Sequence, residues 1–216
     1  MDIIEWMKFI PARRRSNRSA PAEKQRNDLQ KNQWKIFRRN GQLMRVVGVD
    51  VGYRNLGLAE YTYTGNGEGH LSFKKRIDIS EYACRPNCRL HHSSHSADYI
   101  SHFIANYSDL FESAEAVVIE RQPPGGLQAV EALLYSALRG KAVLVNPISL
   151  HKHFQYDHLD YEERKEEAVR IAGLSGPGRL HDIADAVLLA RYYVDRVVRP
   201  IERRNMPVED LDRFKY

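Results

Sequence analysis

The sequence predicts an α/β fold in which a mixed five-stranded sheet is covered by helices on both faces. Three short apolar runs follow one another with only tight turns between them, which is typical of an antiparallel meander. Two further apolar runs alternate with helical patterns, which is typical of strands joined by crossovers. With 216 residues and 43% apolar content, the chain can build one good core, and we assign this domain to residues 45–198.

The three strands of the predicted meander occupy residues 45–51, 56–63 and 70–79. The first is nearly all apolar and β-branched, which suits a strand that is buried on both faces. A turn that begins at Gly52 and a glycine-rich hairpin at 65–69 connect the three strands.

The rest of the domain alternates helices with two buried strands. We predict strands at 116–120 and 141–146 and helices at 96–110, 126–139, 161–173 and 181–198. A polar loop at 80–95 precedes the first of these helices, and proline and glycine clusters separate the later elements. In such a sheet, side chains from distant parts of the chain can converge where the strands end.

Most of the positive charge lies at the start of the chain. The formal net charge is +5, but residues 1–44 hold eleven Lys/Arg against four Asp/Glu. Residues 45–216 hold the remaining 22 Lys/Arg against 24 Asp/Glu. Such a basic N-terminal extension, with Arg13, Arg14 and Arg15 in a row, suits the phosphates of a nucleic acid. The alternative is a solvated tail that only aids solubility. Residues 199–216 form a charged C-terminal tail.

The composition argues against membrane and secreted proteins. No apolar run approaches the roughly 20 residues of a membrane span, and no signal peptide is evident. The two cysteines, Cys84 and Cys88, are too few for a disulfide framework and are expected to be reduced. We therefore expect a soluble intracellular protein without a membrane partner.

Four acidic residues stand where the predicted fold can bring them together. Asp50 ends the first apolar strand, and Glu120 ends the strand at 116–120. Asp182 and Asp185 lie three residues apart at the start of the last helix, which puts both on one face. Because a carboxylate at the end of a buried strand is unfavourable unless it binds a positive group, a metal ion is the obvious candidate partner.

Four acids from three elements are typical of a site that holds two Mg²⁺ ions. Such ions activate a water on one side of a phosphodiester and stabilise the departing oxygen on the other. Each acid alone has a simpler explanation: Asp50 as a turn cap, Glu120 as a surface residue, and Asp182 and Asp185 as favourable charges at a helix start. Their joint occurrence in this order favours the metal site.

The segments around these acids resemble the three acidic motifs of the RuvC-type Holliday junction resolvases. They are GVDVGxRNLG at 48–57, VVIExQ at 117–122 and HDIADA at 181–186. The resemblance covers residues 45–198 and is strongest to the branch that contains poxvirus, other large-DNA-virus and fungal mitochondrial enzymes. It implies an RNase H-like fold, a homodimer, Mg²⁺ or Mn²⁺ as the metal, and symmetric cutting of two like-polarity strands of a four-way DNA junction.

The resemblance also assigns roles to individual residues. The implied catalytic acids, which would hold two Mg²⁺ ions per subunit with Mn²⁺ as a substitute, are Asp50, Glu120, Asp182 and Asp185. Gln122 matches a glutamine of the viral and fungal branch and is expected to contact DNA, and Lys152 and Lys165 match lysines that approach DNA phosphates. Lysines on helices are also often merely solvated. His181 either orients the attacking water or only faces solvent.

The loop at 80–95 contains a dense set of sulfur and imidazole side chains. The candidate ligands of a structural zinc ion are Cys84, Cys88, His91 and His95. Zinc ligands are usually spread over a larger loop, whereas this set spans only twelve residues. The alternative is a polar loop with a buried cysteine or two.

The leading interpretation is a metal-dependent, structure-selective endodeoxyribonuclease that resolves four-way DNA junctions. It would act in recombination, repair or replication of a large DNA virus, in the nucleus or cytoplasm of an infected cell. Two alternatives keep the fold: a non-catalytic protein that binds branched DNA, and a nuclease for RNA–DNA hybrids or flaps.

A further alternative is a kinase or ATPase of the actin-like type, which the DxGxxN pattern at 50–55 superficially resembles. Those proteins need two such domains and roughly twice this length. The alternative also leaves Glu120, Asp182 and Asp185 unexplained. We therefore expect no nucleotide cofactor.

Overall fold

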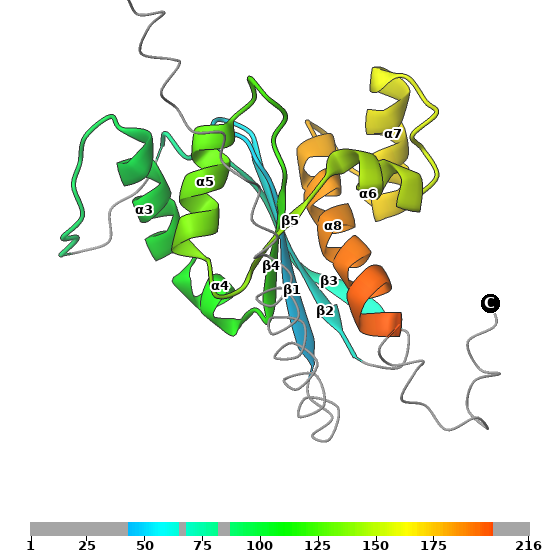
Figure 1. Cartoon of the computed structure of the whole chain (residues 1–216), viewed down its shortest axis with the longest axis horizontal. Helices are drawn as coiled ribbons and strands as arrows, with labels where there is room; N and C mark the ends of the chain where they lie inside the picture. The colour runs from blue at the N-terminus through cyan, green and yellow to red at the C-terminus, as the bar shows by residue number, and fades with distance from the viewer. Residues whose placement is uncertain (1–42, 65–67, 82–86, 201–216) are drawn as a thin grey trace, which may run out of the picture. The chain divides into compact units, whose positions relative to one another are not determined.

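A mixed sheet of five strands, in the order β3-β2-β1-β4-β5, forms the middle layer of the domain (Figure 1). The structure is a computed structural model and describes residues 43–64, 68–81 and 87–200. The strands are β1 (Met44–Asp50), β2 (Leu56–Tyr63), β3 (Gly69–Ile77), β4 (Ala116–Glu120) and β5 (Ala142–Val145). β1, β2 and β3 pair antiparallel, whereas β4 pairs parallel with both β1 and β5. The predicted mixed five-stranded sheet is confirmed.

Several predicted features lie outside the described residues. They include Arg13, Arg14 and Arg15 of the basic extension, Cys84, and the C-terminal tail from residue 201 onward. The described residues all belong to one compact unit. The assignment of 1–44 and 199–216 as separate segments stays a prediction.

Helices cover both faces of the sheet (Figure 1). One face carries α3 (Ser96–Asn106), α4 (Ser108–Ser113) and α5 (Gln128–Ala137). The other face carries α6 (Pro147–His153), α7 (Tyr161–Ala172) and α8 (His181–Tyr193), and α8 continues into a short π-helical segment, η2 (Val194–Val198). No helix within the described ranges is long and apolar enough to cross a membrane.

Two helical regions differ from the prediction. The expected helix at 96–110 is divided at Tyr107, whose φ of −112° and ψ of 24° leave the helical region, so that α4 begins after it. The helix α6 is not predicted by the sequence pattern, because its 7 residues are too few to display a helical period. It is favoured locally instead: the Asn146 side chain accepts a hydrogen bond from the Ile148 amide at 2.9 Å, and Pro147 opens the helix.

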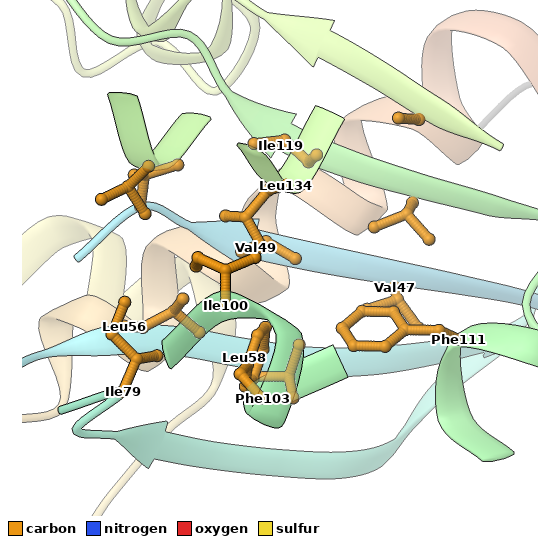
Figure 2. Close-up of a cluster of buried hydrophobic side chains, with 14 of the residues drawn as sticks. Val47, Val49, Leu56, Leu58, Ile79, Ile100, Phe103, Phe111, Ile119 and Leu134 are labelled. Atoms are coloured by element: carbon orange, nitrogen blue, oxygen red, sulfur yellow. The ribbon is translucent and has the colours of Figure 1, made fainter. Parts of the chain in front are cut away.

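The main hydrophobic core lies between the sheet and the helices α3, α4 and α5 (Figure 2). Its buried side chains include Val47, Val49, Leu58, Phe103, Phe111, Ile119 and Leu134. Successive residues of a strand point to opposite faces, so Gly48 and Asp50 of β1 belong to the face that carries α8. By the same alternation, Glu120 at the end of β4 belongs to that face, because Ile119 enters the main core.

The helix α8 lies directly on the backbone of β1 and β2. A Cβ atom built on Gly48 would lie 1.9 Å from the carbonyl oxygen of Ala186, and one built on Gly57 would lie 1.9 Å from that of Asp182. A side chain at either position would force the helix and the strands apart. The two glycines therefore allow the close approach that brings the first turn of α8 to the end of β1.

Candidate active site

Asp50 and Glu120 stand beside each other at the ends of the parallel strands β1 and β4. The residues that precede them, Val49 and Ile119, are paired in the sheet. Both acids point to the face covered by α8, and their carboxyl groups are close enough to share a hydrogen bond. The structure thus brings together the two acids that the sequence placed at strand ends.

The first two turns of α8 supply the other two acids. Asp182 is buried, and Asp185 lies one turn further along the same side of the helix. Gly57, which pairs with Asp50 in the sheet, contacts the backbone of Asp182. Electrostatic interactions link Asp50 to Glu120, Asp185 and Asp182. All four predicted acids therefore gather at one end of the sheet.

Burial and mutual repulsion raise the pKa values of these carboxyl groups. Burial raises the pKa of Asp50 well above its ordinary value, and the charges of Glu120 and Asp185 add to this effect. The pKa of Asp185 rises to about 7, first through burial and then through the charges of Glu120 and Asp182. Burial also raises the pKa of Glu120, although hydrogen bonds with Asp50 and Gln122 act to lower it. Negative charge held away from water in this way is stabilised by a cation.

The donor atoms at this site suit a hard divalent cation. All four side chains offer carboxylate oxygens, which Mg²⁺ and Mn²⁺ prefer. A buried hydroxyl group lies within electrostatic reach of two of them: Tyr156 is 1% exposed, and its oxygen makes no hydrogen bond within the described part of the chain. Burial, with the charges of Asp185 and Glu120, raises the pKa of Tyr156. An unsatisfied polar atom within reach of the acids fits a site that takes up an ion with its waters.

A different group of possible metal ligands lies apart from the four acids. Among the residues that the structure describes, one ligand atom from each of Cys88, His92 and His102 lies within 4.8 Å of the other two.

A short hydrogen-bond network fixes the position of Glu120. Nε2 of Gln122 donates to Oε2 of Glu120 at 2.8 Å, and the backbone N–H of Gln122 donates to Oε2 of Glu131 at 2.5 Å. Oε1 of Gln122 accepts a hydrogen bond from the Leu127 amide at 3.4 Å. The structure thus places Gln122 against Glu120. Sequence reasoning missed Glu131, because its partner here is a backbone N–H group that no side-chain pattern reveals.

Asp182 is paired with a cation of the protein. Nε of Arg179 donates to Oδ2 of Asp182 at 2.8 Å, and the Arg179 side chain is 46% exposed. Nε2 of His181 lies 3.5 Å from Oδ1 of Asp182, and burial lowers the pKa of His181, which favours its neutral form near pH 7. Sequence reasoning missed Arg179, although a spacing of three residues before an acid at a helix start is a usable signal.

The two predicted phosphate-contacting lysines lie on the α8 side of the sheet, on α6 and α7. Burial dominates the pKa of Asp185, but the positive charge of Lys165 acts to lower it, so Lys165 lies within electrostatic reach of the acids. Nζ of Lys165 lies 3.1 Å from Oε1 of Glu162 and 3.8 Å from the centre of the Tyr161 ring. Lys152 is exposed on α6.

The group of possible metal ligands in the described part of the chain includes one of the predicted zinc ligands, Cys88. The structure groups Cys88 with His92 and His102 and does not include His91 or His95. His95 instead caps α3 through its side chain, and the fourth predicted ligand, Cys84, lies outside the described ranges. Sequence reasoning missed His102 because it falls inside a helix, where a buried histidine does not stand out from its apolar neighbours.

Comparisons with known proteins point to one structural class. The chain matches no protein-family model and no curated protein. Fowlpox virus resolvase, solved with its substrate Holliday junction DNA, is 15% identical, with 72% of this chain and 99% of that chain covered and a TM-score of 0.52. The yeast mitochondrial Holliday junction resolvase Ydc2 is 14% identical, with 75% and 81% covered and a TM-score of 0.51.

A bacterial structure also matches. RuvC of Thermus thermophilus is 21% identical, with 70% of this chain and 96% of that chain covered and a TM-score of 0.47. The viral and yeast matches show that this chain has the same RNase H-like fold as these two resolvases. The fold implied by the three acidic motifs is therefore confirmed.

Proposed function

We propose that this protein is a metal-dependent endodeoxyribonuclease of the RuvC type that resolves four-way DNA junctions. The observation that carries the proposal is the convergence of Asp50, Glu120, Asp182 and Asp185 from β1, β4 and α8 at one end of the sheet. The fold supports it, since the fowlpox virus and yeast proteins of the same fold are both named as Holliday junction resolvases.

The four acids would hold the metal, which we take to be Mg²⁺, two ions per subunit, with Mn²⁺ as a substitute. The fit rests on the oxygen donors, on the raised pKa values of Asp50 and Asp185, and on the unsatisfied hydroxyl of Tyr156. When bound, the ions supply an activated water and stabilise the departing oxygen of the phosphodiester.

The protein's own residues then orient the acids and the DNA. Gln122 holds the carboxylate of Glu120 in one orientation. Arg179 neutralises Asp182 in the metal-free site, and its exposed guanidinium can turn to a DNA phosphate once a cation takes its place. Lys165, beside the acids, and Lys152, exposed on α6, would contact the backbone of the junction.

A homodimer follows from the proposed reaction. A four-way junction has near-two-fold symmetry, and two matching nicks are most simply made by two identical sites related by a two-fold axis. Arg13, Arg14 and Arg15 of the basic extension would bind the outgoing DNA arms through phosphate contacts. The biological setting that we propose is the recombination, repair or replication of a large DNA virus, in the nucleus or cytoplasm of the infected cell.

The test is cleavage of a synthetic immobile four-way DNA junction in Mg²⁺ by the wild type and by Asp50→Asn. The control is Asp109→Asn, which removes an exposed acid on α4. We expect paired, symmetric, ligatable nicks from the wild type and the control, and no cleavage by Asp50→Asn. Tight junction binding without any cleavage in Mg²⁺ or Mn²⁺ would instead favour the binding-protein alternative. Cleavage of RNA–DNA hybrids or flaps alone would contradict the proposal that four-way junctions are the substrate.

A further inference from the structure

A second cluster of metal-ligating side chains is separate from the four acids and is formed by the segment between β3 and α3 together with α3 itself. It consists of Cys88, His92 and His102, and one ligand atom from each lies within 4.8 Å of the other two. Cys88 is half-buried, His92 is exposed and His102 is 2% exposed. The rings of the two histidines meet edge to face, with their centres 4.9 Å apart.

The hydrogen bonding of His102 fixes which of its nitrogen atoms can bind a metal. Nε2 of His102 lies 3.1 Å from the carbonyl oxygen of His91. A carbonyl can only accept, so Nε2 carries the proton and Nδ1 of the neutral ring keeps its lone pair. Nδ1 faces Sγ of Cys88 at 3.9 Å. A histidine ligand that donates its other N–H to a backbone carbonyl is the usual arrangement around bound metals.

We propose that Cys88, His92 and His102 bind a structural zinc ion. Zinc–sulfur bonds of about 2.3 Å and zinc–nitrogen bonds of about 2.0 to 2.1 Å place the ligand atoms of a tetrahedral site about 3.3 to 3.6 Å apart. The 3.9 Å between Sγ and Nδ1 needs only a small inward movement, which the exposed ring of His92 can match by rotation. Three protein ligands leave the fourth tetrahedral position for one further donor.

The ligand chemistry separates this site from the acid site. Thiolate and imidazole favour zinc, whereas carboxylate oxygens favour Mg²⁺ and Mn²⁺. A hydrogen bond between the Cys88 thiol and His102 would use two of these side chains, whereas a metal ion would use all three. The convergence of all three is what indicates a metal.

The zinc ion would position a segment next to the acid site. His102 follows Tyr99 by one turn of α3, and the Tyr99 ring packs edge to face on Tyr53 at 5.7 Å between centres. Tyr53 lies in the turn between β1 and β2, just after Asp50. Its carbonyl oxygen also accepts a hydrogen bond from the Ile79 amide at 2.9 Å. Fixing residues 88–92 to α3 would therefore hold one side of the active-site turn.

The test measures metal content directly and needs no cleavage assay, so its outcome is independent of the proposed nuclease function. The full-length, untagged protein is purified without chelators, and its zinc is measured by mass spectrometry. His92→Ala removes a ligand at an exposed position, and His91→Ala is the matched control, since His91 contributes only its backbone carbonyl. We expect about one zinc ion per chain in the wild type and in His91→Ala, and loss of it in His92→Ala.

Cobalt reports on the sulfur ligand. Replacement of zinc by Co²⁺ should give a thiolate-to-cobalt charge-transfer band in the wild type that is absent in Cys88→Ser. Far-ultraviolet circular dichroism shows whether each variant is folded, and His92→Ala decides the question if Cys88→Ser does not fold. A wild-type protein that holds no zinc and gives no cobalt band would overturn the proposal, as would equal zinc loss in His91→Ala and His92→Ala.

Discussion

Gly57 contacts the backbone of Asp182 so closely that a Cβ atom on Gly57 would lie 1.9 Å from the Asp182 carbonyl oxygen and 3.2 Å from Cβ of Asp50. Gly57 of β2 thus lies next to both α8, which carries Asp182, and the Asp50 position of β1. This close contact depends on the absence of a side chain, because the backbone of α8 occupies the space that a Cβ would need. The position of Asp182 is therefore determined by a residue 125 positions earlier in the chain.

We predict that Gly57→Ala destabilises the protein and also impairs the site. Relief of the clash requires α8 to move away from β2, which should lower the free energy of unfolding by roughly 1 to 3 kcal/mol. The same movement takes Asp182 away from Asp50, so cleavage should fall even at temperatures where the variant is folded. Urea denaturation and junction cleavage measure the two effects.

Gly140→Ala is the matched control for this prediction. A Cβ at Gly140 meets no atom within 4 Å, so this change should leave stability within roughly 1 kcal/mol of the wild type. Equal effects of the two substitutions would show that the close approach of α8 is not what matters.

The metal-free protein should lose stability as the pH rises. Burial, with the charges of Glu120 and Asp182, raises the pKa of Asp185 from its ordinary 3.8 to about 7. Between these two values the folded state keeps a proton that the unfolded chain has released, so the free energy of unfolding falls with increasing pH. Thermal melting in a chelator from pH 4 to pH 8 should therefore show a falling Tm, and Mg²⁺ should restore it at the upper end.

Asp185→Asn should make this dependence less steep, because it removes one of the groups whose pKa is raised, whereas the surface change Asp109→Asn should not. A metal-free wild type whose Tm rises between pH 5 and pH 7 would contradict the raised pKa of Asp185.

The acid residues could be predicted because each stands at a point where the sequence pattern changes. Asp50 and Glu120 end apolar β-branched runs, and Asp182 and Asp185 share the spacing of one helix face. The glycines at 48 and 57 gave no comparable signal. Their role depends on how far α8 lies from the sheet, and local sequence does not encode that distance.

The residues that sequence reasoning missed have partners that are far away or have no side-chain signature. Tyr156 follows a short helix that shows no period, and its aromatic ring looks like an ordinary core residue until the structure places it within electrostatic reach of Asp185. The predicted zinc ligands were chosen from spacing within one loop. His102, which was not among them, joins the group proposed from the structure because α3 turns its buried side toward Cys88.

We predict that Gln122→Ala weakens the metal site and not the binding of DNA. Loss of the 2.8 Å hydrogen bond to Glu120 removes the group that orients this carboxylate, and loss of such an orienting partner typically costs about 10- to 100-fold in metal affinity or activity. The Mg²⁺ concentration needed for half-maximal cleavage should rise, while junction binding in a chelator stays unchanged.

Gln128→Ala, at an exposed position of α5, serves as the control for Gln122→Ala. If Gln122 contacts DNA instead, the junction Kd will rise while the Mg²⁺ requirement stays the same.

The basic extension should supply affinity without contributing to the chemistry. Deletion of residues 1–42 removes all eleven of its Lys/Arg but keeps β1, which begins at Met44. For every phosphate that the protein no longer neutralises, the slope of log K against log salt should become shallower by about 0.9. Junction binding should therefore weaken and become less salt-dependent, while the cleavage rate on saturating DNA stays the same.

The control is a full-length variant in which glutamine replaces the same Lys/Arg. It removes the charge of the extension without shortening the chain. Because counterion release follows only from charge, a salt slope that neither change alters would mean that the extension does not touch the DNA.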